Sequence, residues 1–435
     1  MRSGPRTGRR EVPSTRAVLD LRTARRLAAG TFGGTGADGM GLELEWLLRR
    51  ADGGPVGADT HAEFVGEASH PLPAGGRVTF EPGGQLELST PVAVSLPALL
   101  EAAATDAATL AARAARLGIL PVGIGLDPTG GRRLVRSDRY EAMAAYFSAR
   151  GPVTRRLGHL MMCATAALQV NVGLPNGDEG RARWEAAHRL GPLLAATFAN
   201  SPVLGDGPSG WGSTRLAVWR DLDPPRTAAV TAIPGDSPGD PVDAPSAWAA
   251  YALAAPVMLV RADRGAVPLR EVLPFARWVR QGHATGFPTA DDLAYHLTTL
   301  FPPVRPRGWL ELRVLDALGE VHWQVAAAVA VTLLTHAGAR REALRTLATA
   351  DRHLDDAPRT GMADPALAGL ADRVLRIAAA ALPDLGAAPL GALVTDWAAR
   401  YPARRRSPAD DLLDAWRTTG SLWSRPAPVS AGAGR

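Results

Sequence analysis

Three short segments of the chain alternate leucine with charged or amide residues. They are residues 42–46, 85–88 and 310–314. In a β-strand, residues two apart lie on the same face, so the leucines predict one apolar face that joins a core. If these strands share a sheet, its opposite face gathers acidic side chains, namely Glu43, Glu45, Glu87 and Glu311, with Glu81 nearby.

Carboxylates gathered in this way repel one another unless a cation neutralises them. Glutamate oxygens are hard ligands that suit Mg²⁺ or Mn²⁺ rather than zinc. The same alternation is also typical of any antiparallel strand with one solvated face. Because all three segments carry acids between apolar residues, a metal site is the favoured interpretation.

The rest of the pattern predicts helices between scattered strands. Apolar residues at helical spacing predict helices at 20–29, 97–117, 138–149 and 181–199, and a helical region from 323 to about 400. Irregularly spaced strands of this kind favour an α+β fold with an antiparallel sheet over a doubly wound fold.

Arginines and amides extend the polar face. The alternation at residues 213–219 predicts a further strand, with Arg215 and Trp219 on one side. Arg313 shares the face of Glu311. Neutral amides that can orient water or a ligand are Gln85, Gln169 and Asn171.

Acids and arginines in one space indicate phosphate or carboxylate chemistry. Carboxylates alone would also serve a metal-dependent phosphohydrolase. The arginine fork matches both phosphate and carboxylate, so the combination favours an ATP-dependent carboxylate–amine ligase. Phosphoryl transfer depends mainly on positioning and charge neutralisation, which fits a site with no nucleophile triad. A binding protein without activity stays an alternative, although the intact set of acids and arginines argues against it.

The chain has 48 basic residues, all of them arginine. A P-loop lysine and a Schiff base are therefore excluded, and phosphates must be held by arginine, backbone N–H groups and metal. The net charge of +5 over 435 residues is modest and gives no argument for nucleic acid.

Cys163 is the only cysteine, which excludes an intrachain disulfide and a cysteine-based zinc cluster. Its apolar neighbours predict a buried, unreactive thiol. The longest apolar run, at residues 325–334, is too short to cross a bilayer. We therefore expect a cytoplasmic protein with no membrane contact.

Several motifs, in order along the chain, resemble those of the glutamate–cysteine ligase family, in its actinobacterial branch serving ergothioneine biosynthesis. They lie at residues 41–45, 81–89, 161–165, 169–173, 199–202, 213–227 and 307–313. The resemblance implies a glutamine-synthetase-like fold, in which six antiparallel strands curl around the site with helices outside. It also implies the reaction: ATP phosphorylates the γ-carboxylate of L-glutamate, and the amine of L-cysteine displaces phosphate to give γ-glutamylcysteine. A relative that uses a different amine acceptor stays an alternative.

The composition of the two ends predicts a disordered arm at 1–15 and a disordered tail at 425–435. Between them, the resemblance implies a single ligase catalytic domain at 16–424. Its C-terminal part is expected to be helical from about residue 320. The oligomeric state is not indicated.

Site roles follow from the resemblance, position by position. Arg313 matches the arginine that contacts the transferred phosphoryl group, and Arg215 matches the arginine that grips the glutamate α-carboxylate. Trp219 either walls the substrate pocket or belongs to the core, and Asn171 is a substrate-binding candidate. The nucleotide or metal candidates are Gln169 and Gln85. The implied ligands of two or more Mg²⁺ ions, with Mn²⁺ as an alternative and ATP as co-substrate, are Glu43, Glu45, Glu81, Glu87 and Glu311.

Overall fold

The computed structural model describes residues 18–34, 39–230, 243–262, 265–319, 321–348 and 356–423, so the predicted arm and tail lie outside it. The strands are β1 (Met40–Arg50), β2 (Arg77–Phe80), β3 (Leu86–Ser89), β4 (Ile119–Val122), β5 (Ala167–Gly173), β6 (Val203–Leu204), β7 (Gly207–Pro208), β8 (Leu259–Ala262), β9 (Gly265–Pro268), β10 (Val304–Pro306) and β11 (Trp309–Asp316).

The first helices are α1 (Leu21–Ala29), α2 (Ala58–Ala68), α3 (Leu96–Arg116), α4 (Asp138–Ser148), α5 (Pro152–Ala164), α6 (Asp178–Thr197), α7 (Thr214–Leu222), α8 (Pro224–Thr227) and α9 (Ala244–Ala254). The later helices are α10 (Phe275–Gln281), α11 (Ala290–Leu297), α12 (His322–Thr335), α13 (Ala337–Leu347), α14 (Ala357–Thr360), α15 (Pro365–Ala381), α16 (Pro389–Arg400) and α17 (Pro408–Thr419).

One sheet organises the molecule. Its strands follow the order β10-β11-β5-β1-β3-β2, and β4 pairs with the far end of β1. Every pairing in this sheet is antiparallel. An antiparallel sheet surrounded by helices confirms the predicted α+β class.

The sheet has one apolar face because its strands alternate. Leu42 and Leu44 of β1, Val170 of β5 and Leu312 of β11 are almost completely buried on that face. They belong to one large core with α3, α6 and α12. Each such side chain contributes roughly 1.5–3 kcal/mol of hydrophobic stabilisation, so register is strongly specified here.

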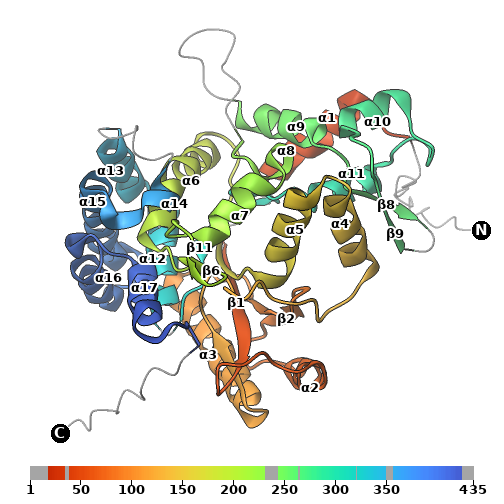
Figure 1. Ribbon diagram of the computed structural model, residues 1–435. Coiled ribbons are helices and arrows are strands. Elements are labelled where there is room, and N and C mark those ends of the chain that lie inside the picture. Colours follow the sequence, from red (N-terminus) through yellow and green to blue (C-terminus); the bar gives the residue numbers. More distant parts are fainter. Residues whose placement is uncertain are drawn as a thin grey trace, which may run out of the picture.

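The C-terminal helices cover this apolar side, as the blue part of Figure 1 shows. Helix α12 contains the longest apolar run and packs against α13, α15 and α16. It is apolar on all sides because it is surrounded by protein. Among the residues that the structure describes, no helix is long and apolar enough to cross a membrane.

The polar face of the sheet is covered by α4, α5 and α7. These helices share a smaller core that includes Tyr146, Phe147, Met162 and Val218. Between the helices and the sheet lies a cavity, which we call the acidic cavity; its walls include Glu45, Glu81, Glu87, Arg215 and Arg313.

The strand predicted at residues 213–219 is wrong. This segment is helix α7, and the Ser213 hydroxyl caps it by accepting the backbone N–H of Leu216 at 3.2 Å. Such a serine cap satisfies a helix N–H group that otherwise lacks a partner. Arg215 and Trp219 are four residues apart, so they still share one face, now as neighbours along a helix.

Candidate active site

The register of the sheet places predicted acids side by side. Glu45 of β1 lies across from Glu87 of β3, and Glu43 lies across from Gln169 of β5. The Gln169 amide donates to Glu45 Oε1 at 3.1 Å, which links the two rows. These four side chains line the acidic cavity together.

Two further acids reach this face by different routes. Glu81 follows β2 in a tight turn, closed by its backbone N–H donating to the Gln85 carbonyl at 3.0 Å, and it lines the same cavity. Glu311 lies across from Asn171 in the pairing of β11 with β5. The five predicted acids therefore share one face of the sheet.

Three acids of this cluster have pKa values raised above their ordinary range, namely Glu43, Glu45 and Glu81. Burial raises the pKa of Glu45 to about 7, and the charge of Glu87 adds to the effect. Burial also raises the pKa of Glu81 to about 8, with further repulsion from Glu45 and Glu87. The pKa of Glu43 is raised by burial and by Glu311. A cation bound beside these carboxylates would stabilise their ionised form and lower their pKa values.

The donor set fits Mg²⁺ or Mn²⁺. Glu45, Glu81 and Glu87 offer carboxylate oxygens from three adjacent segments around one cavity. In the described part of the chain, no group of three or more acidic, histidine or cysteine side chains is placed so that it could hold a metal ion by itself. Mg²⁺ usually takes one or two carboxylates and completes its shell with water and substrate phosphates, so an open acidic cavity suits it.

Glu311 is in a different electrostatic environment. Its carboxylate accepts two hydrogen bonds from Arg305, at 2.6 and 3.1 Å, and one each from Arg313 at 3.0 Å and Arg307 at 3.3 Å. Burial alone would raise the pKa of Glu311, but the charges of Arg305 and Arg313 outweigh it and lower this pKa to about 2. Its predicted role as a metal ligand stays a prediction, since three arginines now occupy its oxygens.

Arg313 is aimed into the cavity by a β-bulge. The pairing of β11 with β5 shifts register between Leu312 and Leu315, which places Arg313 in the irregular step. Its guanidinium donates to Gln169 Oε1 at 2.6 Å as well as to Glu311. Bulges commonly re-aim a side chain at an active site. A half-buried guanidinium held by two hydrogen bonds is suited to stabilising charge that develops on a transferred phosphoryl group.

Arg215 enters from helix α7 and lies beside Arg313. It is only 3% exposed, and its Nη2 donates to the Arg313 carbonyl at 2.8 Å. Its Nη1 forms an ion pair with Asp316 Oδ1 at 3.7 Å. The Asp316 carboxylate in turn accepts hydrogen bonds from the hydroxyls of Ser201 and Ser213. Nε and Nη1 of Arg215 have no hydrogen-bond partner. A buried guanidinium with unused donors is a suitable grip for a carboxylate.

Trp219 is half-buried one helical turn after Arg215. Its ring lies 5.3 Å from that of Phe301, and the Arg313 guanidinium lies 5.9 Å from its centroid. Both aromatic rings line the acidic cavity. Trp219 also packs against the smaller core, so it occupies both predicted places, and its role in binding substrate stays a prediction.

The predicted amides have mainly structural partners. Gln85 donates to the carbonyls of Thr165 at 2.9 Å and Met162 at 3.4 Å, at the end of α5. Asn171 donates to Glu43 Oε1 at 3.4 Å and accepts the indole N–H of Trp309 at 3.1 Å. Their roles as nucleotide and substrate ligands stay predictions.

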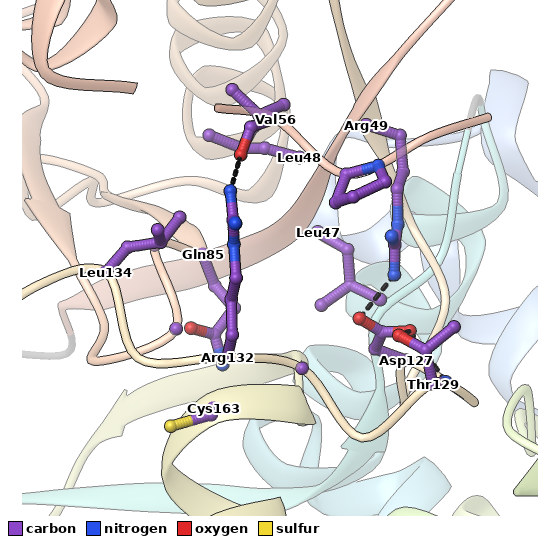
Figure 2. Close-up of a pocket in the computed structure, with 14 residues that line it drawn as sticks. Leu47, Leu48, Arg49, Val56, Gln85, Asp127, Thr129, Arg132, Leu134 and Cys163 are labelled. Atoms are coloured by element: carbon purple, nitrogen blue, oxygen red, sulfur yellow. Dashed lines mark hydrogen bonds and ion pairs between the residues drawn. The ribbon is translucent and has the colours of Figure 1, made fainter. Parts of the chain in front are cut away.

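A second cavity lies behind Gln85, and Figure 2 shows its walls. An ion pair between Arg49 and Asp127 forms one side, and Arg132 donates to the Val56 carbonyl on the other. Cys163 lies at its base, where burial raises the pKa of the thiol. The predicted burial of Cys163 is confirmed, and its lack of reactivity stays a prediction.

The sequence assigned no role to two arginines that line the acidic cavity, Arg305 and Arg307. Arg305 and Arg307 alternate with proline and glycine just before β11, so they carried no strand pattern of their own. Arg139 at the start of α4 also lines the cavity and donates to Thr298 at 3.0 and 3.1 Å. The absence of lysine could have pointed to these arginines, because in a chain without lysine any side-chain cation that contacts phosphate must be an arginine.

The sequence is similar to those of known glutamate–cysteine ligases. The model of glutamate–cysteine ligase family 2 (GCS2) matches residues 39–407. The glutamate–cysteine ligase EgtA of Mycolicibacterium smegmatis is 43% identical over 350 residues, covering 79% of each chain. The enzyme of the same name from Mycobacterium tuberculosis H37Rv is 40% identical over 356 residues, 79% of this chain and 78% of that one. A chloroplastic glutamate–cysteine ligase of Medicago truncatula is 31% identical over 247 residues, 55% of this chain and 46% of that one.

Solved structures give weaker likenesses. A glutamate–cysteine ligase of Francisella tularensis in complex with AMP has a TM-score of 0.48 at 12% identity, covering 91% of this chain and 90% of that one. A bifunctional glutathione synthetase from Pasteurella multocida has a TM-score of 0.45 at 13% identity, covering 94% and 52%. Family membership therefore rests on the sequence matches, which extend over the acidic strands, the arginines and most of the helices. On that ground, the chain belongs to glutamate–cysteine ligase family 2.

Proposed function

We propose that the protein is an ATP- and Mg²⁺-dependent ligase that joins the γ-carboxylate of L-glutamate to the amine of L-cysteine. Its similarity to the two mycobacterial EgtA ligases supports γ-glutamylcysteine as the product, on the way to ergothioneine. The observation that carries the proposal is the contact between Arg215 and Arg313 at the edge of the acidic cavity. The arginine that would bind the glutamate α-carboxylate then lies next to the arginine that would contact the transferred phosphoryl group. Phosphorylation of the γ-carboxylate requires the two substrates to be this close.

The reaction has two steps. A γ-carboxylate oxygen of glutamate attacks the γ-phosphorus of ATP, and ADP leaves. The amine nitrogen of cysteine then attacks the acyl carbon, an amide bond forms, and phosphate leaves after the amine loses a proton. Bound Mg²⁺ would neutralise charge on the triphosphate.

The protein's own residues position these groups. Arg215 holds the glutamate α-carboxylate with its unused donors, which leaves the γ-carboxylate directed at the cavity. Arg313 stabilises the phosphoryl group in transfer. Trp219 and Phe301 give the cavity an aromatic wall that excludes water, which protects an acyl phosphate from hydrolysis.

Two other functions are tested by the same experiment. A ligase with another amine acceptor would keep all of these contacts, because none of them selects a thiol. A metal-dependent phosphohydrolase would use the acids alone, and the buried Arg215 would then have no ligand.

The experiment follows ADP release by purified protein with ATP, Mg²⁺ and L-glutamate, with and without a panel of amines, and identifies products by mass spectrometry. Cysteine-dependent ADP release with the mass of γ-glutamylcysteine supports the proposal. If ADP release depends on a different amine, that amine is the acceptor instead of cysteine. Phosphate release without any amine or glutamate would support the hydrolase.

A further inference from the structure

Trp309 is an exposed aromatic side chain at one end of the polar sheet face. It is 38% exposed, although it lies in a strand that is otherwise mostly buried. It precedes Glu311 by two residues and Arg313 by four, so it belongs to the same face of β11. The residue paired with it on β5 is Gly173, which places no side chain beside the indole.

The ring is held in place rather than free to turn. Its N–H donates to Asn171 Oδ1 at 3.1 Å, and Asn171 in turn donates to Glu43. The Arg307 guanidinium lies 5.1 Å from the ring centroid and also reaches Glu311. A fixed indole beside an arginine suits a ligand that has an aromatic base next to phosphates.

The order of side chains along β11 matches the order of groups in ATP. Arg313 lies at the amino-acid end, where Arg215 contacts it. Glu311 comes next, and the guanidinium of Arg307, from the turn before β11, reaches its carboxylate. Trp309 lies at the other end of the strand. At roughly 3.3 Å per residue, Trp309 is about 13 Å from Arg313 along the strand, which is comparable to the span of an extended nucleoside triphosphate.

We propose that Trp309 is the platform on which the adenine base of ATP stacks, with Arg307 contacting the phosphates between the base and Arg313. This inference rests on the proposed function, since it takes Arg313 as the site of phosphoryl transfer. Stacking accepts any base with a flat face. The platform therefore contributes affinity for nucleotides more than selection among them.

The test compares Trp309→Ala, Trp309→Phe and Phe287→Ala, the last being an exposed aromatic outside the cavity. Equilibrium dialysis measures MgATP and inorganic tripolyphosphate, and kinetics give kcat and the KM for ATP. Base stacking on an aromatic side chain is worth roughly 1–3 kcal/mol, so Trp309→Ala should weaken MgATP binding by about 5- to 150-fold. Tripolyphosphate binding and kcat should change little, Trp309→Phe should keep most of the affinity, and Phe287→Ala should match the wild type.

An equal loss of MgATP and tripolyphosphate binding in Trp309→Ala would overturn the proposal, because it would indicate damage to the sheet. Unchanged MgATP binding would overturn it as well. The dialysis needs no turnover, so a protein that binds MgATP through Trp309 but ligates nothing would refute the proposed function and leave the platform supported.

Discussion

Glu311 shares one sheet face with Glu45 and Glu81, but its pKa is shifted in the opposite direction from theirs. Glu311 is surrounded by Arg305, Arg307 and Arg313, and its pKa is lowered to about 2. Glu45 and Glu81 lie a few residues away across the sheet, and their pKa values are raised to about 7 and 8. Burial opposes the charged form in both groups, so the nearby arginines make the difference.

The comparison indicates that glutamates at different positions on this face have different roles. Glu311 already has its countercharges, so it orients the arginines that handle a phosphoryl group. The arginine charges that act on Glu45 and Glu81 do not offset burial and the neighbouring acids, so these are the carboxylates most ready to bind a metal. Removing an acid should therefore damage the fold at one place and the metal site at the other.

The largest expected effect is on folding, in Glu311→Gln. This change leaves the buried Arg305 and the half-buried Arg313 without the carboxylate that they share, and breaking a buried pair typically costs about 3–5 kcal/mol of unfolding free energy. Urea unfolding measures it, and turnover should also be lost. Glu141→Gln, which breaks the surface pairs with Arg133 and Arg136, should cost less than about 1 kcal/mol. Equal stability of the two variants would remove Glu311 from the centre of the arginine cluster.

Glu45→Gln should have the opposite profile. Because it relieves repulsion with Glu87, the metal-free protein should be as stable as the wild type or more so. Its Mg²⁺-dependent turnover should fall by about 100-fold or more, since charge stabilisation at the transferred phosphate is lost. Steady-state kinetics over a Mg²⁺ series check this, with the exposed Glu101→Gln as control. Full activity at ordinary Mg²⁺ concentrations would exclude Glu45 from the metal ligands.

Arg215→Ala should raise the KM for glutamate by about 10- to 100-fold, the usual worth of a hydrogen bond to a charged group. The KM for ATP should change much less, because Arg215 lies at the opposite end of β11 from Trp309. Arg220→Ala, on the outer side of the same helix, should leave both values near the wild type. Equal effects of Arg215→Ala on both KM values would mean that it does not hold the glutamate α-carboxylate.

The pH dependence of Mg²⁺ binding tests the same comparison without a substitution. Glu45 and Glu81 are protonated in the metal-free fold below their raised pKa values, and a metal ligand must be ionised. Affinity should rise by about tenfold per pH unit for each proton displaced, from pH 6 to about 8, and then level off. Calorimetric titration with Mg²⁺ measures this slope. A flat profile between pH 6 and 8 would show that neither carboxylate binds the ion.

The sequence predicted the acidic face because strand alternation has a period of two and the register preserves it. Glu45 across from Glu87 is a direct result of that pattern. Composition also helped, because a chain without lysine must place arginines around any phosphate. The burial of Cys163 was predicted correctly from its apolar neighbours alone.

The rest depended on contacts that local patterns do not contain. The helix at Arg215 was mistaken for a strand, because the serine that caps it also fits an alternating pattern. The bulge that aims Arg313 appears only in the pairing with β5. The three arginines around Glu311 come from β10, the turn after it and β11, so their convergence needed the hairpin to be folded.

The central claim is that ATP phosphorylates the γ-carboxylate of a glutamate whose α-carboxylate is held by Arg215, next to Arg313. The direct test supplies L-glutamate labelled with ¹⁸O in its γ-carboxylate, together with ATP, Mg²⁺ and L-cysteine, and measures the mass of the phosphate released. A γ-glutamyl phosphate predicts that one ¹⁸O passes from glutamate into phosphate for every peptide bond formed. Phosphate without ¹⁸O would mean that its new oxygen came from water, and it would contradict the ligase account.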